Sequence, residues 1–224
     1  MSKIATREGC GRWLADGVIR AASQVGGDAP NCAVYTLKGA SPRSHDHRAR
    51  WYELFDTCVS NTSTIEAAFG APPDLPGMPQ LLDPFSPDQI VACNSASAGW
   101  RQFEDSLVIC RFCSNYSPVA TLDAVRAITG WQDLDVAEAS DVGKRATNLL
   151  RAFNLRAKLD VVAMEAPSPR YASTPVDGPA RGKSMADHFY AMRRAYWQRM
   201  GWDPDSGVPL PATLTALGLE DVAA

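Results

Sequence analysis

The feature that most constrains the fold is a long apolar stripe in the second half of the chain. From Asp135 onward, apolar side chains recur every third or fourth residue, which is the period of one face of an α-helix. The positions are Val136, Ala139, Val142, Ala146, Leu149, Leu150 and Phe153. The stripe predicts a helix over 135–155 that buries one face against other helices.

Other helices are predicted from their start and stop signals. Ser86-Pro87 and Ser117-Pro118 each place a capping hydroxyl before a proline at the first helical position, and Gly130 ends the second helix. Further patterns predict helices over 10–25, 49–59, 184–200 and 211–217, a short strand over 33–37, and irregular structure over 71–84 and 157–182. We therefore expect a mainly α fold with one or two short strands. The helices over 86–104, 118–129, 135–155 and 184–200 should share one core.

Composition excludes several classes of protein. The 224 residues carry a formal net charge of −3, which leaves no electrostatic footprint for nucleic acid or an acidic membrane surface. No apolar run approaches the roughly 20 residues that span a bilayer, and Met1 to Ile4 lack the apolar core of a signal peptide. Six irregularly spaced cysteines then favour reduced thiols or metal ligands over a disulfide framework. We expect a cytoplasmic protein.

An aspartate and a cysteine lie five residues apart where the 86–104 helix gives way to a loop. A carboxylate at Asp105 can accept hydrogen bonds from amino and ring N–H groups, and a thiolate at Cys110 is a soft ligand for iron. On spacing alone, the commoner arrangement is a helix-capping Asp and a buried small Cys. A cofactor-binding role for Asp105 and Cys110 is favoured only by the sequence motifs found elsewhere in the chain.

Short sequence blocks run in order along nearly the whole chain. They are Arg7-Glu8-Gly9, Leu14 to Val18, Lys38-Gly39, Asp46-His47-Arg48, Ile128 to Trp131, Val142 to Arg145, Asn148 to Arg156, Met200 to Asp203 and Leu214 to Leu219. Together they resemble the C-terminal region of the aldehyde ferredoxin oxidoreductases, enzymes with a tungsten or molybdenum bis-pterin and a [4Fe-4S] cluster. The resemblance implies that 1–40 is the tail of the family's middle helical domain and that 41–224 is its C-terminal helical domain.

The resemblance also implies cofactor-binding residues. Asp105 and Cys110 match the family's D-x-x-G-x-C motif, whose Asp bonds a pterin and whose Cys is the fourth cluster ligand, and Ile109 would lie beside the pterin. Val108 stands where the family has Gly, so its branched side chain is expected to hinder close pterin contact. One cysteine cannot hold a cluster that needs four. An N-terminal half or partner subunit would therefore supply the pterin domain and the family's C-x2-C-x3-C segment.

Glu66 aligns with a family histidine that is proposed to move protons at the aldehyde. A carboxyl buried beside a metal centre can have a raised pKa and serve as acid or base, and the alternative is a surface or helix-cap glutamate. The substitution suggests a substrate unlike simple aldehydes. The polar and aromatic residues of 45–51 are expected either to line a substrate cleft or to form a solvated turn. Polar residues of the long helix, including Arg151, are expected to be structural.

Two functions follow from these patterns. The resemblance implies part of an oxidoreductase that interconverts an aldehyde and an acid by two electrons, which pass through the cluster to ferredoxin. The alternative is a non-catalytic helical module that binds no cofactor. A zinc site formed by Cys110 and Cys113 with His45 and His47 is a further alternative, although neither histidine has the usual spacing.

Overall fold

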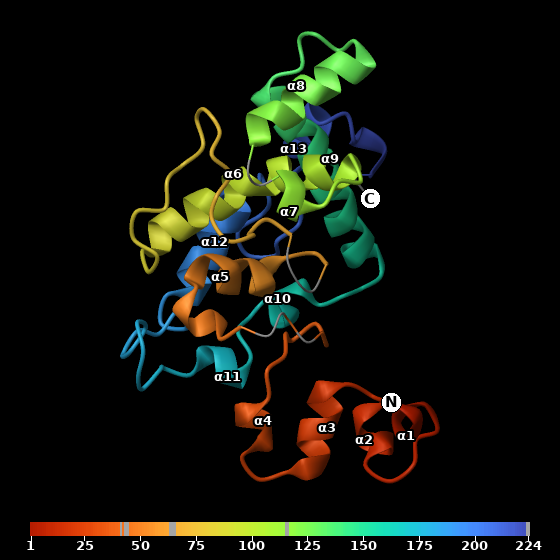
Figure 1. Ribbon diagram of the computed structural model, residues 1–224, viewed down its shortest axis with the longest axis vertical. Coiled ribbons are helices and arrows are strands. Elements are labelled where there is room, and N and C mark those ends of the chain that lie inside the picture. Colours follow the sequence, from red (N-terminus) through yellow and green to blue (C-terminus); the bar gives the residue numbers. More distant parts are fainter. Residues whose placement is uncertain (41, 43–44, 63–65, 115–116, 223–224) are drawn as a thin grey trace.

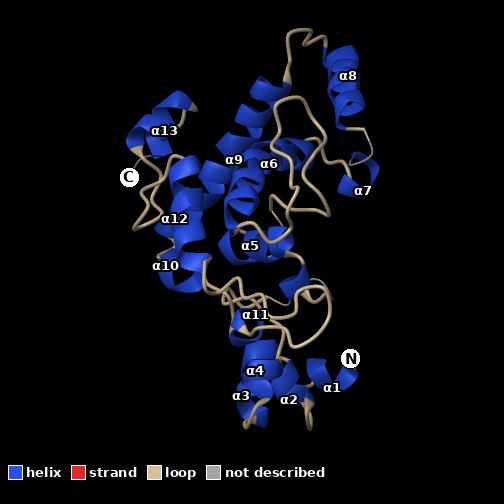
Figure 2. Ribbon diagram, turned by 90° about the vertical axis from the view of Figure 1, so that its left-hand side faces the viewer, coloured by secondary structure: helices blue, strands red, loops and turns tan. Residues whose placement is uncertain are grey.

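The computed structural model describes residues 1–224 except 41, 43–44, 63–65, 115–116 and 223–224. Helices joined by long loops make up the described residues (Figures 1 and 2). Within these ranges the β structure is one isolated antiparallel bridge, between Trp202 and Pro209. The prediction of a mainly α fold is confirmed.

The centre of the molecule is the packing of α6 (Pro87–Ser106) against α9 (Val136–Arg156). Both helices begin as predicted. The Ser86 hydroxyl accepts a hydrogen bond from the Gln89 backbone N–H at 3.4 Å, and the Asp135 carboxylate accepts one from the Glu138 N–H at 2.8 Å. The two backbones come close enough that a Cβ atom on Gly99 would lie 2.5 Å from the Ser140 carbonyl oxygen.

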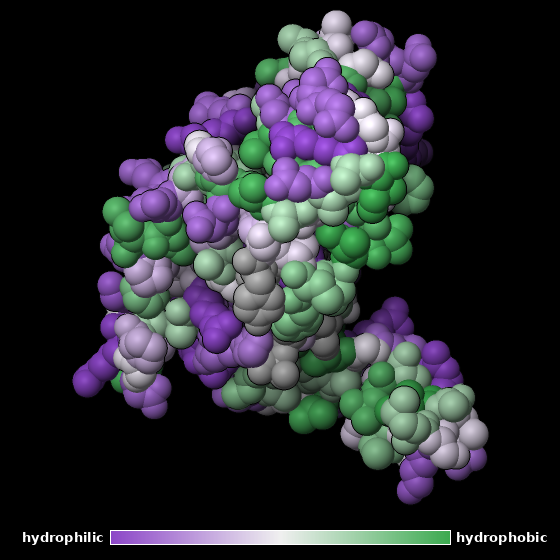
Figure 3. Space-filling model, turned by 45° about the horizontal axis from the view of Figure 1, so that its top comes forward, coloured by the Kyte–Doolittle hydropathy of each residue, from purple (hydrophilic) through white to green (hydrophobic). Residues whose placement is uncertain are grey.

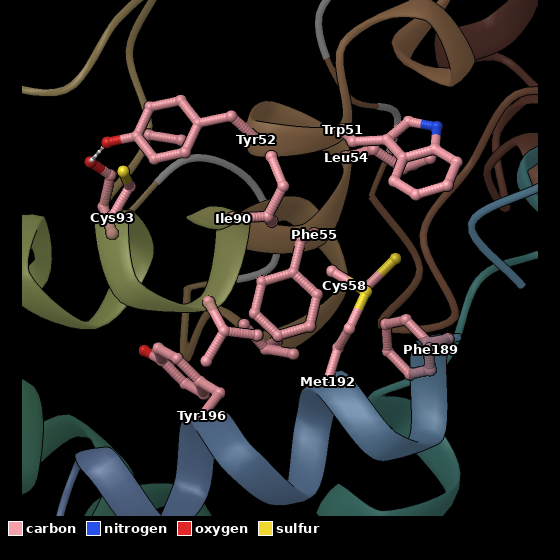
Figure 4. Packing of buried hydrophobic residues seen from close by; sticks show 14 of the residues in the cluster. Trp51, Tyr52, Leu54, Phe55, Cys58, Ile90, Cys93, Phe189, Met192 and Tyr196 are labelled. Carbon is pink, nitrogen blue, oxygen red and sulfur yellow. Dashed lines mark hydrogen bonds between the residues drawn. The ribbon is translucent and has the colours of Figure 1, made fainter. Parts of the chain in front are cut away.

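Buried apolar side chains form two clusters along α6. The first lies between α6, α5 (Trp51–Val59) and α12 (Phe189–Arg199), and Figure 4 shows Phe55 of α5 pointing toward α12 beside Ile90 of α6. The second surrounds Trp100 and Phe103 and includes Leu122 of α8 (Pro118–Thr129). The expectation of one shared core is therefore corrected to two clusters joined by α6.

The first four helices form a small group at one end of the molecule. They are α1 (Ser2–Ala5), α2 (Gly11–Leu14), α3 (Val18–Val25) and α4 (Ala29–Cys32), and α4 contacts α11 (Pro169–Ala172) of the main body. In Figure 3 this group is the lobe at the lower right. The predicted helix over 10–25 is interrupted because Gly17 has a φ of 89°, outside the helical range.

Two other predictions of local structure were wrong. The segment 33–37 is not a strand, because the Thr36 N–H donates to the Ala40 carbonyl in a turn at 2.8 Å. The helix expected from Ser184 begins at Phe189, because Met185 is buried in the first cluster and the residues after it form a turn. The remaining elements are η1 (His47–Ala49), α7 (Arg111–Ser114), α10 (Val161–Met164), α13 (Pro211–Ala216) and η2 (Glu220–Val222).

Candidate functional site

The Asp105–Cys110 segment forms an exposed turn between α6 and α7. Val108 adopts a left-handed conformation with a φ of 58°, and its side chain is 92% exposed. This conformation costs an L-residue with a Cβ roughly 1–2 kcal/mol, and glycine avoids that cost. A glycine here, as the resemblance implies for the family, would avoid this cost. The valine side chain points into solvent on the same turn as the aspartate and the cysteine.

Asp105 is paired with Arg111 in a two-pronged ion pair. Arg111 Nη2 lies 2.6 Å from Asp105 Oδ2, and Nε lies 3.1 Å from Oδ1. The Asp105 side chain remains 47% exposed. Because each carboxylate oxygen can accept more than one hydrogen bond, the exposed side of Asp105 can still accept from a ligand's N–H groups.

Cys110 lies directly before α7, and its side chain is exposed, as is that of Cys113. The buried cysteine that spacing alone favours is therefore not what the structure contains. Within the described ranges, no group of three or more His, Cys, Asp and Glu side chains could hold a metal ion. The zinc alternative is not supported, because His47 is buried with Nδ1 3.0 Å from the Tyr171 hydroxyl and Nε2 3.5 Å from Glu53.

Glu66 is buried, unlike a surface or helix-cap glutamate. Its carboxylate accepts hydrogen bonds from the backbone N–H and the side-chain amide of Asn61. The neighbouring carboxylate of Asp56, on α5, accepts the Glu66 and Ala67 backbone N–H groups, both at 2.8 Å. Burial, followed by the nearby negative charge of Asp56, raises the pKa of Glu66 to about 7, while the two Asn61 hydrogen bonds act in the opposite direction. Glu66 therefore has a pKa suited to proton transfer near neutral pH.

Sequence reasoning missed Lys38, a partly buried cation near this segment. Its ammonium group donates to the carbonyl oxygens of Cys58 and Ser60, at the end of α5, with 2.8 Å to Cys58. Burial lowers the pKa of Lys38. The sequence feature that could have indicated Lys38 is the Lys38-Gly39 motif, one of those on which the family resemblance rests.

A second buried ionic cluster lies between α9 and α12. Arg151 forms an ion pair with Glu165, both fully buried, and Glu165 also accepts from Trp197 Nε1 at 3.0 Å. The Arg151 guanidinium lies 4.4 Å from the centre of the Trp202 ring. These contacts pair the two opposite charges within the core, which agrees with the structural role expected for Arg151.

The cluster at 45–51 is a turn and part of the core. Asp46 forms an ion pair with Arg48 at 2.6 Å and lies 3.5 Å from Arg170. His47 and Trp51 are buried. The expected turn is present at Asp46, whose carboxylate is paired, but the expectation that the segment is solvated is wrong for His47 and Trp51.

Ile109 lies on an apolar groove of about 460 Å³ beside the exposed turn. The groove is lined by Leu107, Ile109, Cys113, Ser114, Ser117, Ala120, Thr121, Ala124, Val125, Ile128 and Thr129. It runs between the end of α6 and one face of α8. Ile109 therefore contributes to an apolar surface next to Cys110.

Fold and turn together define a helical domain that presents one carboxylate and one thiol at its surface. The sequence profile of a family described as aldehyde ferredoxin oxidoreductase, domains 2 and 3, matches residues 1–219. The chain belongs to the aldehyde ferredoxin oxidoreductase family, and the resemblance seen in the sequence is confirmed.

Individual relatives agree with this assignment. The chain is 26% identical to the tungsten-containing aldehyde ferredoxin oxidoreductase of Pyrococcus furiosus over 212 residues, covering 93% of this chain and 34% of that protein. The enzyme of the same name from Pyrococcus abyssi is 27% identical over 229 residues, covering 98% of this chain and 36% of that protein. The chain thus spans about a third of the length of these curated relatives.

A solved structure has the same fold. It is the active site complex BamBC of benzoyl coenzyme A reductase with 1,5-dienoyl-CoA, which superimposes with a TM-score of 0.70 at 19% identity. The match covers 99% of this chain and 38% of that one. Among the described residues, no helix combines the length and apolar character needed to cross a membrane.

Proposed function

We propose that this chain is the C-terminal part of an oxidoreductase that interconverts an aldehyde and an acid. Its N-terminal part, in the same polypeptide or in a partner subunit, would carry the pterin domain and three cluster cysteines. The observation that carries the proposal is the exposed Cys110 thiol, next to a half-exposed Asp105, in a chain that matches only domains 2 and 3 of its family. On this proposal, 1–40 is the tail of the middle domain and 41–224 the C-terminal domain.

The residues of the turn fit the two cofactors of the family. Cys110 offers an accessible cysteine sulfur, the ligand atom that iron–sulfur clusters use, but a cluster requires three more cysteines from elsewhere. Asp105 offers a carboxylate that Arg111 leaves open on one side, which suits the amino and ring N–H groups of a pterin. Ile109 would face the pterin from the apolar groove. Val108 is the residue that fits least, because its exposed side chain occupies the approach to the turn.

Each residue has one role in this proposal. Cys110 ligates iron as the fourth cysteine, and Asp105 orients the pterin through hydrogen bonds. Glu66 accepts or donates a proton at the substrate, because its buried carboxyl has a pKa of about 7. When bound, a tungsten or molybdenum bis-pterin with a [4Fe-4S] cluster supplies two-electron aldehyde–acid chemistry and passes the electrons singly to ferredoxin. The replacement of the family's histidine by Glu66 favours a substrate other than the simple aldehydes.

The proposal is tested by metal content. The chain is coexpressed with the polypeptide that supplies the pterin domain and the C-x2-C-x3-C segment, and the complex is purified through a tag on this chain. We expect iron, sulfide and tungsten or molybdenum in the copurified complex, and oxidation of aldehydes with a ferredoxin or viologen acceptor. Glu66→Gln should lower turnover while leaving the metals in place.

The opposite result supports the non-catalytic alternative. A chain that copurifies with the partner but contains no iron and no tungsten or molybdenum is a helical interaction module. A chain that neither binds the partner nor contains metal is a folded remnant of the family.

A further inference from the structure

Arg111 connects the turn that carries Cys110 to the backbone of Glu66. From these contacts we infer that Arg111 is a positioning residue, which fixes the thiol and the buried carboxyl in one rigid frame. This inference deepens the proposed function and rests on it for the roles of Cys110 and Glu66. The contacts themselves do not depend on any cofactor.

The first set of contacts holds the backbone of Glu66. Asp56 accepts its N–H at 2.8 Å, and Arg111 Nη2 donates to its carbonyl oxygen at 3.0 Å. The residue is therefore bound from both sides, by a carboxylate of α5 and by a guanidinium of α7. Because Asp56 is buried, the positive charge of Arg111 also stabilises its ionised form against the burial that raises its pKa.

The second set of contacts holds the turn between α6 and α7. The Arg111 guanidinium pairs with Asp105 through two nitrogens and also donates to the Arg101 carbonyl oxygen of α6 at 3.3 Å. The Arg111 side chain is 11% exposed and its two carbonyl contacts are partly buried, whereas its Asp105 partner stays 47% exposed. One side chain thus joins the end of α6 and the adjoining Cys110 turn to the Glu66 segment, which lies 45 residues before Arg111 in the sequence.

A neighbouring contact joins the same two segments. The ring of Phe112 packs edge-on against that of Phe69, with ring centres 4.9 Å apart. This contact keeps α7 beside the 66–70 segment when Arg111 is changed, so the variants are expected to fold. An arginine is suited to the position because its planar group presents several donors in fixed directions, which a lysine does not.

The test follows hydrogen exchange in the isolated chain. In Arg111→Gln we expect amide exchange in peptides covering 66–70 and 106–114 to rise together, by about tenfold, which corresponds to about 1.4 kcal/mol of local stability. Arg111→Lys should give a smaller rise in the same two peptides, because an ammonium group can keep the Asp105 pair but not all of the carbonyl contacts. Arg145→Gln, which alters a surface ion pair of α9 with Glu138, is the matched control and should change neither peptide.

A rise in only one of the two peptides, or no difference from Arg145→Gln, overturns the inference. In the metal-loaded complex, Arg111→Lys and Arg111→Gln should also change the electron paramagnetic resonance signature of the reduced cluster, with lysine closer to the wild type. An unchanged signature in both variants overturns the positioning role. A wild-type complex without iron contradicts the proposed function instead, and the exchange experiment then still decides whether Arg111 joins the two segments.

Discussion

Gly99 of α6 and Gly143 of α9 face each other where the two helices cross, and a Cβ atom on Gly143 would lie 1.7 Å from the Gly99 carbonyl oxygen. No side chain fits between these backbones. The contact joins α6, which takes part in both hydrophobic clusters, to α9, which takes part in the second, so it helps to fix the position of the Asp105 turn at the end of α6.

Gly143→Ala should therefore destabilise the chain. Alanine is the better helix former, but the added methyl group must push the helices apart, and overpacking of this kind costs about 1–3 kcal/mol. The free energy of unfolding in urea measures the effect. Ala137→Leu adds a larger group at an exposed position of the same helix, and it should change stability by no more than about 0.5 kcal/mol. A Gly143→Ala chain as stable as the wild type would show that the helices do not pack in this way.

Val108→Gly should stabilise the chain. It removes the cost of a left-handed valine, and the greater freedom of glycine in the unfolded state offsets part of this gain, which leaves up to about 1 kcal/mol. Ala124→Gly, at an exposed position in the middle of α8, should destabilise it, because glycine weakens a regular helix. The urea midpoint of unfolding should shift upward in the first variant and downward in the second, relative to the wild type, if the turn is left-handed. A downward shift in both variants contradicts it.

Glu165→Gln should be strongly destabilising. It leaves the Arg151 guanidinium buried without its counter-charge, and breaking a buried pair in this way costs about 3–5 kcal/mol. Asp123→Asn breaks the exposed ion pair with Arg126 and should cost less than about 1 kcal/mol. Thermal unfolding of both variants measures the difference, and equal effects would mean that the Arg151 cluster is open to water.

Stability should depend on pH through Glu66. Burial, followed by the charge of Asp56, raises its pKa from the ordinary 4.5 to about 7, so the folded chain binds a proton more tightly than the unfolded chain. The stabilisation is fully present below pH 4.5 and is lost as the pH rises through about 7, with an upper limit of about 3 kcal/mol. Asp56, whose pKa burial also raises, acts in the same direction.

Glu66→Gln isolates this contribution. The unfolding free energy of the wild type should fall between pH 5 and pH 8 relative to that of the variant. Glu8→Gln, at an exposed position, should follow the wild type. Parallel curves for the wild type and Glu66→Gln would show that the carboxyl is ionised in the folded chain throughout this range.

The sequence predicted best the elements whose ends are set by local signals. The helix over 118–129 has the predicted bounds because Ser117-Pro118 and Gly130 act within one turn of each end. The start of α12 was misplaced because burial of Met185, a tertiary effect, outweighed the capping preference of Ser184. The break at Gly17 was missed because the apolar pattern continues on both sides of it.

The candidate site was predictable only in part. Asp105 and Cys110 follow from a motif, and the structure places both at the surface of one turn. The contact of Arg111 with the Glu66 carbonyl joins residues 45 apart in sequence, and no local sequence pattern predicts it. The roles of Asp105, Ile109, Cys110 and Glu66 with cofactor and substrate stay predictions.

Cluster assembly after a single thiol substitution tests the central claim most directly. Cys110→Ser and Cys113→Ser are each coexpressed with the polypeptide that supplies the pterin domain, and the reduced complexes are compared by iron content and electron paramagnetic resonance. Both thiols are exposed and lie within one helical turn, so the pair controls for general damage to the loop. We predict a wild-type cluster in the Cys113→Ser complex and a lost or altered cluster in the Cys110→Ser complex. An intact four-iron cluster in the Cys110→Ser complex would contradict the account.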